Sequence, residues 1–100
     1  MIHKGCTCTD TFNFPYPRSE VATLFITYSE EEEVIVEKTV DDCDFLEGKI
    51  SVKLSQEETL RFGDNACVET QIRGRLIDNT AIKSKIVKVY TDRVLKKDVI

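Results

Sequence analysis

The sequence contains no tryptophan, one histidine, two prolines and four glycines among its 100 residues. The histidine, His3, stands near the N-terminus, where chain ends commonly fray, so the side chain that most often acts as a general base is almost missing. A serine elbow, a phosphate-cradling glycine loop and an HExxH pattern are also absent. These absences argue against an enzyme, and we expect neither a cofactor nor a small-molecule substrate.

Long apolar runs are missing as well. None approaches the roughly 20 residues of a membrane helix, and no apolar stretch follows the N-terminus as in a secretory signal. Apolar residues make up 41% of the chain and charged residues 32%, which is typical of a soluble globular protein. One hundred residues suffice for one hydrophobic core. We therefore expect one soluble domain over residues 1–100, with no membrane contact and no export by a signal peptide.

Alternation of apolar and polar residues with a period of two is the main pattern that is present. It predicts seven or eight short strands, separated by turn signals every 8–12 residues or so. One helical turn is expected near residues 55–61, where Ser55 and Glu58 form a capping box, and it should cross from one sheet to another. The fold class is therefore all-β: an antiparallel β-sandwich of immunoglobulin-like size, without the Cys…Trp…Cys pattern of antibody domains.

The sequence does not determine how the two strands of the last hairpin pair. The dipeptide at 78–79 is a good two-residue turn, which would place Leu76 opposite Ala81. Lys83 and Lys85 would then fall on the face that carries the core residues. Either these lysines lie beyond the core, or a bulge shifts the register, because a slip of one residue moves every side chain to the other face.

Four cysteines could be metal ligands, disulfides or ordinary strand residues. Cys6 and Cys8 would share one face of a strand with Cα atoms roughly 6.5–7 Å apart, which suits a shared metal better than a disulfide. Zinc would also need Cys43 and Cys67, or His3, beside them. Without an export signal, stable disulfides are not expected. We favour small packed thiols, with the metal site as an alternative.

Charge is distributed unevenly along the chain. Residues 1–60 carry 5 basic and 13 acidic side chains (−8), and residues 61–100 carry 9 basic and 5 acidic ones (+4), which gives the net charge of −4. Such a chain could attract copies of itself head to tail, unless the fold interleaves the two parts. Nucleic acid is not the expected partner, because the chain is acidic and no aromatic pair interleaves its basic residues. The predicted partner-binding residues are Arg73, Arg75, Lys83, Lys85, Lys88, Glu31 and Glu32.

Three segments carry a family resemblance: the opening strand TFNFPY, the capped turn SQEETL, and the hairpin RLIDNTAIKS followed by a VL…DVI ending. In this order they resemble small β-sandwich proteins encoded among the structural genes of tailed phages and prophages of Gram-positive bacteria. The chain is similar, more distantly, to the N-terminal domain of phage baseplate upper proteins. It departs from the pattern at Asn79, where glycine is common, at Gly74 within a strand, and at its four cysteines.

The resemblance implies a protein of the virion or of the host-cell cytoplasm that works by protein binding, as a multimer. The leading hypothesis is a virion structural or assembly module of the tail or baseplate that binds copies of itself or other virion proteins. A second hypothesis is a phage effector that binds a host or defence component, with the acidic residues 30–33 or 41–44 imitating nucleic acid. A third is a small metal-binding module that uses Cys6 and Cys8.

Overall fold

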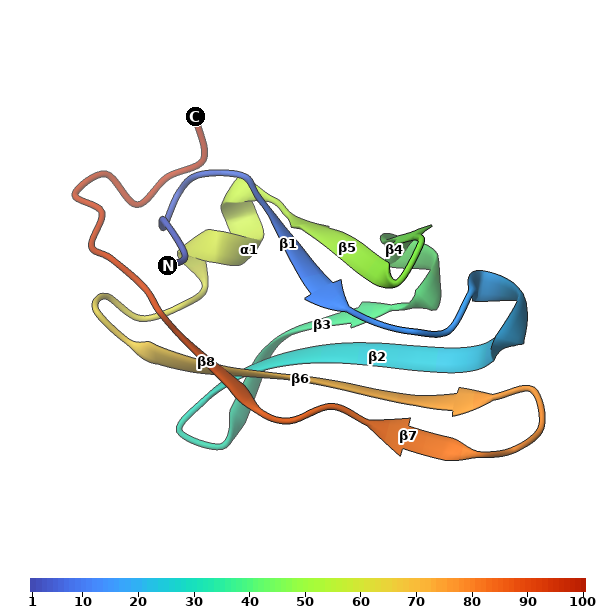
Figure 1. The fold of residues 1–100 in the computed structure, drawn as a ribbon. Coiled ribbons are helices and arrows are strands. Elements are labelled where there is room, and N and C mark those ends of the chain that lie inside the picture. The colour runs from blue at the N-terminus through green and yellow to red at the C-terminus, as the bar shows by residue number, and fades with distance from the viewer.

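Two antiparallel sheets face each other in the computed structural model, which describes residues 1–100 (Figure 1). The smaller sheet has the order β1 (Cys8–Asn13), β5 (Lys49–Leu54), β4 (Cys43–Leu46). The larger one has the order β3 (Glu33–Thr39), β2 (Val21–Glu30), β6 (Cys67–Leu76), after which β7 (Ala81–Lys83) and β8 (Val87–Tyr90) both pair with β6. The predicted antiparallel β-sandwich is confirmed, with eight strands.

Short helices connect the sheets: α1 (Gln56–Leu60) and two 3-10 turns, η1 (Arg18–Glu20) and η2 (Val40–Asp42). At the start of α1 the backbone N–H of Glu58 donates to Ser55 Oγ at 3.2 Å. In return the N–H of Ser55 donates to Glu58 Oε1 at 2.9 Å. This reciprocal pair satisfies two N–H groups that the first helical turn leaves free. Both the capping box and the crossing between sheets, from β5 to β6, are confirmed.

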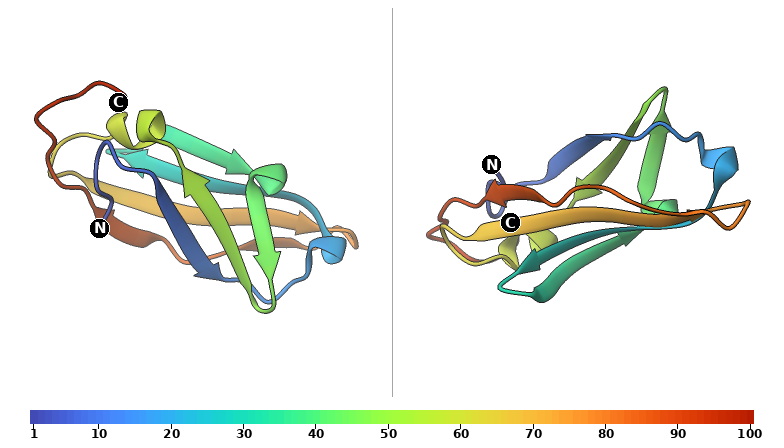
Figure 2. Two further views of the ribbon diagram at one scale, coloured as in Figure 1. Left: turned by 90° about the horizontal axis from the view of Figure 1, so that it is seen from above. Right: turned by 60° about the horizontal axis from the view of Figure 1, so that its bottom comes forward.

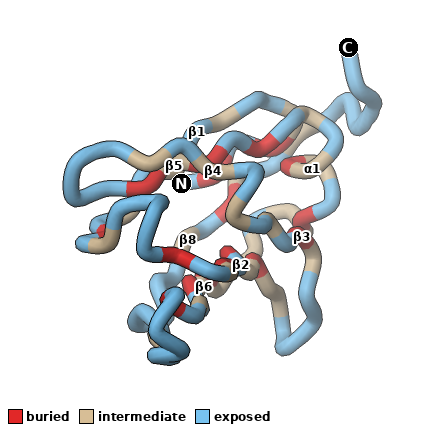
Figure 3. Tube along the Cα trace, turned by 90° about the vertical axis from the view of Figure 1, so that its right-hand side faces the viewer, coloured by how far each residue is buried: buried red, intermediate tan, exposed pale blue.

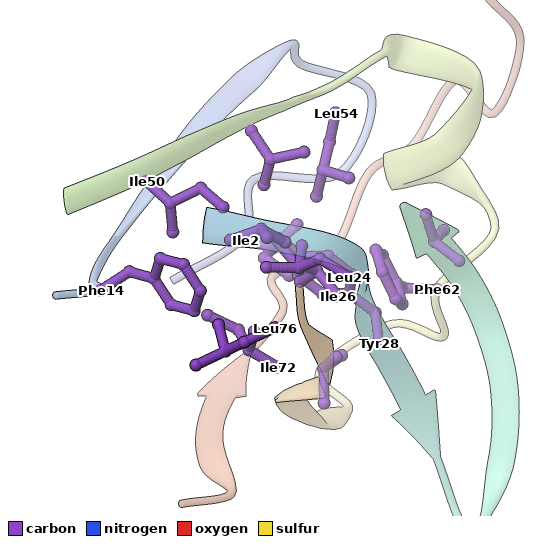
Figure 4. Packing of buried hydrophobic residues seen from close by; sticks show 14 residues of the cluster. Ile2, Phe14, Leu24, Ile26, Tyr28, Ile50, Leu54, Phe62, Ile72 and Leu76 are labelled. Carbon is purple, nitrogen blue, oxygen red and sulfur yellow. The ribbon is translucent and has the colours of Figure 1, made fainter. Parts of the chain in front are cut away.

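The core lies between the two sheets, where alternate residues of each strand point inward (Figures 3 and 4). Fourteen buried apolar residues form one cluster. The strands supply most of it, including Leu24, Ile26 and Tyr28 of β2 and Ile50 of β5, while Phe62 follows α1. Before the last hairpin, alternation therefore predicted the inward faces correctly, because one face of each strand must leave water.

The N-terminal segment is part of this core, so the expectation of a frayed terminus is wrong. Ile2 is only 1% exposed and lies among side chains from both sheets (Figure 4). Its N–H donates to the Tyr90 carbonyl at 2.9 Å, and its carbonyl accepts from Asp92 N–H at 3.2 Å. His3 Nδ1 lies 2.8 Å from Asp92 Oδ2. Burial of Ile2 and the contact of His3 with the Asp92 carboxylate thus hold the N-terminal segment in place.

The β6–β7 hairpin has a longer loop than predicted. Arg75, not Leu76, pairs with Ala81, so the predicted pairing is wrong by one residue. The N–H of Asn79 donates to the Leu76 carbonyl at 2.9 Å, and Asn79 itself takes a left-handed conformation with φ of 71°. Because Leu76 N–H also donates to the Thr80 carbonyl at 2.9 Å, residues 77–79 form a three-residue loop whose last residue has positive φ. As a result Ile82, rather than Ala81, packs against the core.

A second shift of register separates β7 from β8. Lys83 pairs with Arg73 and Val87 pairs with Thr70, which leaves one extra residue in the connection 84–86. Ser84 bridges the gap, because its N–H donates to the Ile72 carbonyl at 2.8 Å and its Oγ accepts from Ile72 N–H at 2.9 Å. The bulge alternative is therefore confirmed, and Lys83 points away from the core.

Candidate functional site

The outer face of the larger sheet gathers three of the predicted basic residues. Phe25, Arg73 and Lys83 lie in one row across β2, β6 and β7, and Arg75 lies in the next row beside Ala81. Residues paired directly across antiparallel strands point to the same side of the sheet, so these side chains form one surface. Phe25, Arg73 and Arg75 line a shallow hollow of about 450 Å³, which we call the basic groove, together with Thr23, Thr27, Glu37, Gly74 and Ala81. Lys83 lies beside the groove, in the row of Arg73, and does not line it.

Gly74 brings the backbones of β2 and β6 unusually close beneath this groove. A Cβ at Gly74 would lie 2.9 Å from the Thr23 carbonyl oxygen, closer than carbon and oxygen can pack. The register of β2 against β6 shifts between Val21 and Thr23, which carries that carbonyl toward the glycine. The glycine within a strand thus has a structural reason, and Ala81 beside it adds only a methyl group to the surface.

The two arginines of the basic groove and the neighbouring Lys83 lack ion-pair partners within the chain. Neither Arg73, Arg75 nor Lys83 has a carboxylate within 4.0 Å, although Lys4 and Lys38 both make ion pairs elsewhere. Like charges that face each other across strands, as Arg73 and Lys83 do, repel. An anionic partner would relieve this repulsion, so the groove is suited to bind carboxylates.

The other two predicted basic residues lie elsewhere. Lys85 is in the exposed connection between β7 and β8. Lys88 pairs with Glu69, whose other neighbour is Ser29 at the far end of β2. Neither residue lines the groove, so the structure separates the predicted set into a group of three and two single lysines.

Glu30–Glu33, which we call the acidic tip, join β2 to β3. Glu31 and Glu32 form a two-residue turn in which both residues have positive φ, 48° and 68°. Glu30 Oε1 accepts a hydrogen bond from Gly63 N–H at 2.7 Å. The other three carboxylates make no ion pair within the chain. The tip therefore presents three exposed, unpaired negative charges.

The acidic tip and the basic groove lie at opposite ends of the larger sheet. Strand β2 connects them, and the six-residue interval from Phe25 to Glu31 corresponds to about 20 Å of strand. The molecule is elongated, with extents of 47 × 26 × 16 Å (Figure 2). Figure 1 shows the turn between β2 and β3 at one end and the β6–β7 hairpin at the other. The acidic tip therefore lies well away from Arg73 and Arg75, whereas Lys88 lies nearer the tip, opposite Glu69.

The four cysteines do not share a site. Cys6 and Cys67 are exposed, while Cys8 and Cys43 lie on either side of β5, and all four are free thiols. Burial is the largest cause that raises the pKa of Cys8 and of Cys43 to about 11, so both thiols stay protonated at neutral pH. No three histidine, cysteine or carboxylate side chains lie together in an arrangement that could hold a metal ion.

One polar contact in the core was not predicted. Tyr28 Oη donates to Asp10 Oδ2 at 2.6 Å and joins the two sheets, since Tyr28 belongs to β2 and Asp10 to β1. Burial, and then the hydrogen bond with this carboxylate, raise the pKa of Tyr28. Alternation placed both residues on inward faces, but only the packing of the two sheets brings them together.

No helix in the structure combines the length and the apolar character that spanning a membrane requires. No protein-family model, curated protein or solved structure matches the chain. The resemblance to phage proteins therefore stays a prediction, and the following proposals rest on the geometry of the larger sheet.

Proposed function

We propose that this chain is a non-enzymatic module that acts by binding protein and self-associates through the basic groove. The observation that carries this proposal is the group of three unpaired cations beside Phe25, which is 40% exposed. The resemblance of the sequence to phage proteins extends it: the module serves as a structural or assembly component of a virion.

The composition of the groove supports a protein partner. Arginine and aromatic side chains are enriched where protein interfaces bind most strongly. Arg73, Arg75 and Phe25 occupy two neighbouring paired strands, so their backbone needs no ordering on binding. Charges that face a complementary partner also speed association and exclude wrong partners.

The test is sedimentation velocity over a wide range of protein concentration, at low and high salt. We expect the wild type to form multimers that dissociate as salt screens the charges. The variant Arg73→Glu/Arg75→Glu should stay monomeric with a nearly unchanged unfolding midpoint, since both side chains are exposed and unpaired.

A matched control reverses two charges on the other sheet. Lys49 and Lys53 are exposed, unpaired, and lie on the outer side of β5. The variant Lys49→Glu/Lys53→Glu changes the net charge equally and should associate like the wild type. A wild-type chain that stays monomeric at every concentration would overturn the proposal, as would equal loss of association in both variants.

A further inference from the structure

We infer that the partner at the basic groove is the acidic tip of a second copy of this chain, so that copies join head to tail. This inference rests on the proposed self-association and names the surface that enters the groove. It assigns two different surfaces to one contact, the turn between β2 and β3 on one copy and the outer face of β2, β6 and β7 on the next.

Charge is the first argument. The tip offers three carboxylates without ion-pair partners, on Glu31, Glu32 and Glu33. The groove offers two unpaired arginines beside one carboxylate, and the unpaired Lys83 lies next to it. Arginine binds carboxylates with two parallel hydrogen bonds, which gives the contact direction as well as energy. The arginines and the tip carboxylates are therefore complementary in charge.

Shape is the second argument. A two-residue turn is a narrow projection, and Glu31 and Glu32 are both exposed at its end. The groove that would receive it lies beside Ala81, whose side chain is only a methyl group. Strand β2 ends and strand β3 begins at this turn, so the tip extends from the body of the molecule (Figure 1).

The third reason is the unfavourable backbone conformation of the tip. Left-handed conformations cost roughly 1–2 kcal/mol for a residue with a Cβ, and such turns favour Asn-Gly. Glu31 and Glu32 bear this cost and also place like charges side by side. Residues that break a local rule in this way are expected where function requires their side chains. Here the side chains supply the carboxylates that Asn-Gly would lack.

The tip cannot enter the groove of its own chain. Along β2, a strand paired on both sides, Phe25 lies about 20 Å from Glu31 and the nearer groove residue Thr27 about 13 Å from it. Each copy would therefore keep one free tip and one free groove after a single contact. A contact between two different surfaces continues until a ring closes or a filament forms.

A charge-swap experiment tests this inference. The variants Glu31→Lys/Glu32→Lys and Arg73→Glu/Arg75→Glu should each associate at least about tenfold more weakly than the wild type, because each brings like charges together. An equimolar mixture should regain association, since the basic tip of the first variant meets the acidic groove of the second. Sedimentation velocity of each variant and of the mixture gives the result.

Three outcomes would overturn the inference in distinguishable ways. If the tip variant associates like the wild type while the groove variant does not, another surface enters the groove and the proposed function stands. If both variants are monomeric and the mixture does not associate, the two sites do not touch each other. If the wild type itself is monomeric, the inference and the proposed function both fail. Circular dichroism of each variant checks that the fold is retained.

Discussion

Glu31 and Glu32 form the turn between β2 and β3 in a backbone conformation that is unfavourable for glutamate. Their positive φ values belong to the turn that matches the twist of β2 and β3. The sequence predicted an acidic, exposed link at this place, and that much is confirmed. The backbone conformation was not predictable, because glutamate is an unfavourable residue for it and no local pattern indicates it.

Replacing these residues should stabilise the chain. The variant Glu31→Asn/Glu32→Gly keeps the turn and removes the steric cost and the repulsion, so we expect the free energy of unfolding to rise by about 1–2 kcal/mol. Urea denaturation of variant and wild type in dilute solution measures the difference. A variant less stable than the wild type would show that the glutamates support the turn, for which the structure gives no reason.

Replacing Gly74, by contrast, should destabilise the chain. Gly74→Ala forces a methyl group to within 2.9 Å of the Thr23 carbonyl, so β2 and β6 must separate, at a cost of about 1–3 kcal/mol. Gly63→Ala is the matched control, since its Cβ would meet only atoms at 3.5 Å or beyond. Denaturation midpoints of the two variants compare them. Equal midpoints would contradict the close approach of the two strands.

Alternation of apolar and polar residues within single segments predicts the strands but not all of their pairing. Alternation located the strands and their inward faces, because burial of one face is a local requirement. It failed at the pairing of β6 with β7 and β8, where one left-handed asparagine and one extra residue near Ser84 set the register. Both devices depend on contacts across the sheet, so single-strand periodicity cannot reveal them.

The N-terminal segment acts as an element of the core despite lacking a regular strand. Ile2→Ala should lower the free energy of unfolding by about 2–5 kcal/mol, because Ile2 is buried between the sheets and its loss leaves a cavity. Met1 is 73% exposed, so Met1→Ala should leave stability unchanged. Thermal denaturation of both variants gives the comparison. A small effect of Ile2→Ala would mean that the segment is detached in solution.

Through Lys4, the same segment makes the free energy of unfolding depend on pH under acidic conditions. Lys4 is buried and lies 2.6 Å from Asp64, and hydrogen bonds from Lys4 and then Lys97 lower the pKa of Asp64 from 3.8 to about 2. A carboxylate with a lowered pKa in the folded state stabilises above its ordinary pKa, and this contribution is lost as the pH falls from 3.8 toward 2.

Asp64→Asn should therefore lower the unfolding midpoint at neutral pH and reduce its fall between pH 4 and pH 2, about the range set by the lowered pKa. The variant also leaves the buried Lys4 ammonium without its partner. Asp98→Asn removes an exposed pair with Lys96 and should change little. Thermal midpoints measured against pH test this, and parallel profiles for wild type and Asp64→Asn would contradict it.

At the scale of the whole molecule, the sequence predicted the sandwich and the opposite charges of its two parts, but not the site that the charges form. Arg73 and Arg75 are two residues apart, and alternation already placed them on one face. Phe25, Ala81 and Lys83 join them only through the pairing of three strands, one of which has a shifted register. The separation of tip and groove along an elongated sheet also follows from the fold alone.

Zero-length carbodiimide cross-linking of the wild-type chain can detect the contact between tip and groove, because it joins a carboxylate to an amine only where they touch. Lys83 lies in the row of Phe25, about 20 Å or more from its own acidic tip, so a bond between them must join two copies. We expect a covalent dimer whose peptides link Glu31 or Glu32 to Lys83, and loss of this link at high salt. A covalent dimer without this link, or no dimer at all, would contradict head-to-tail association through the basic groove.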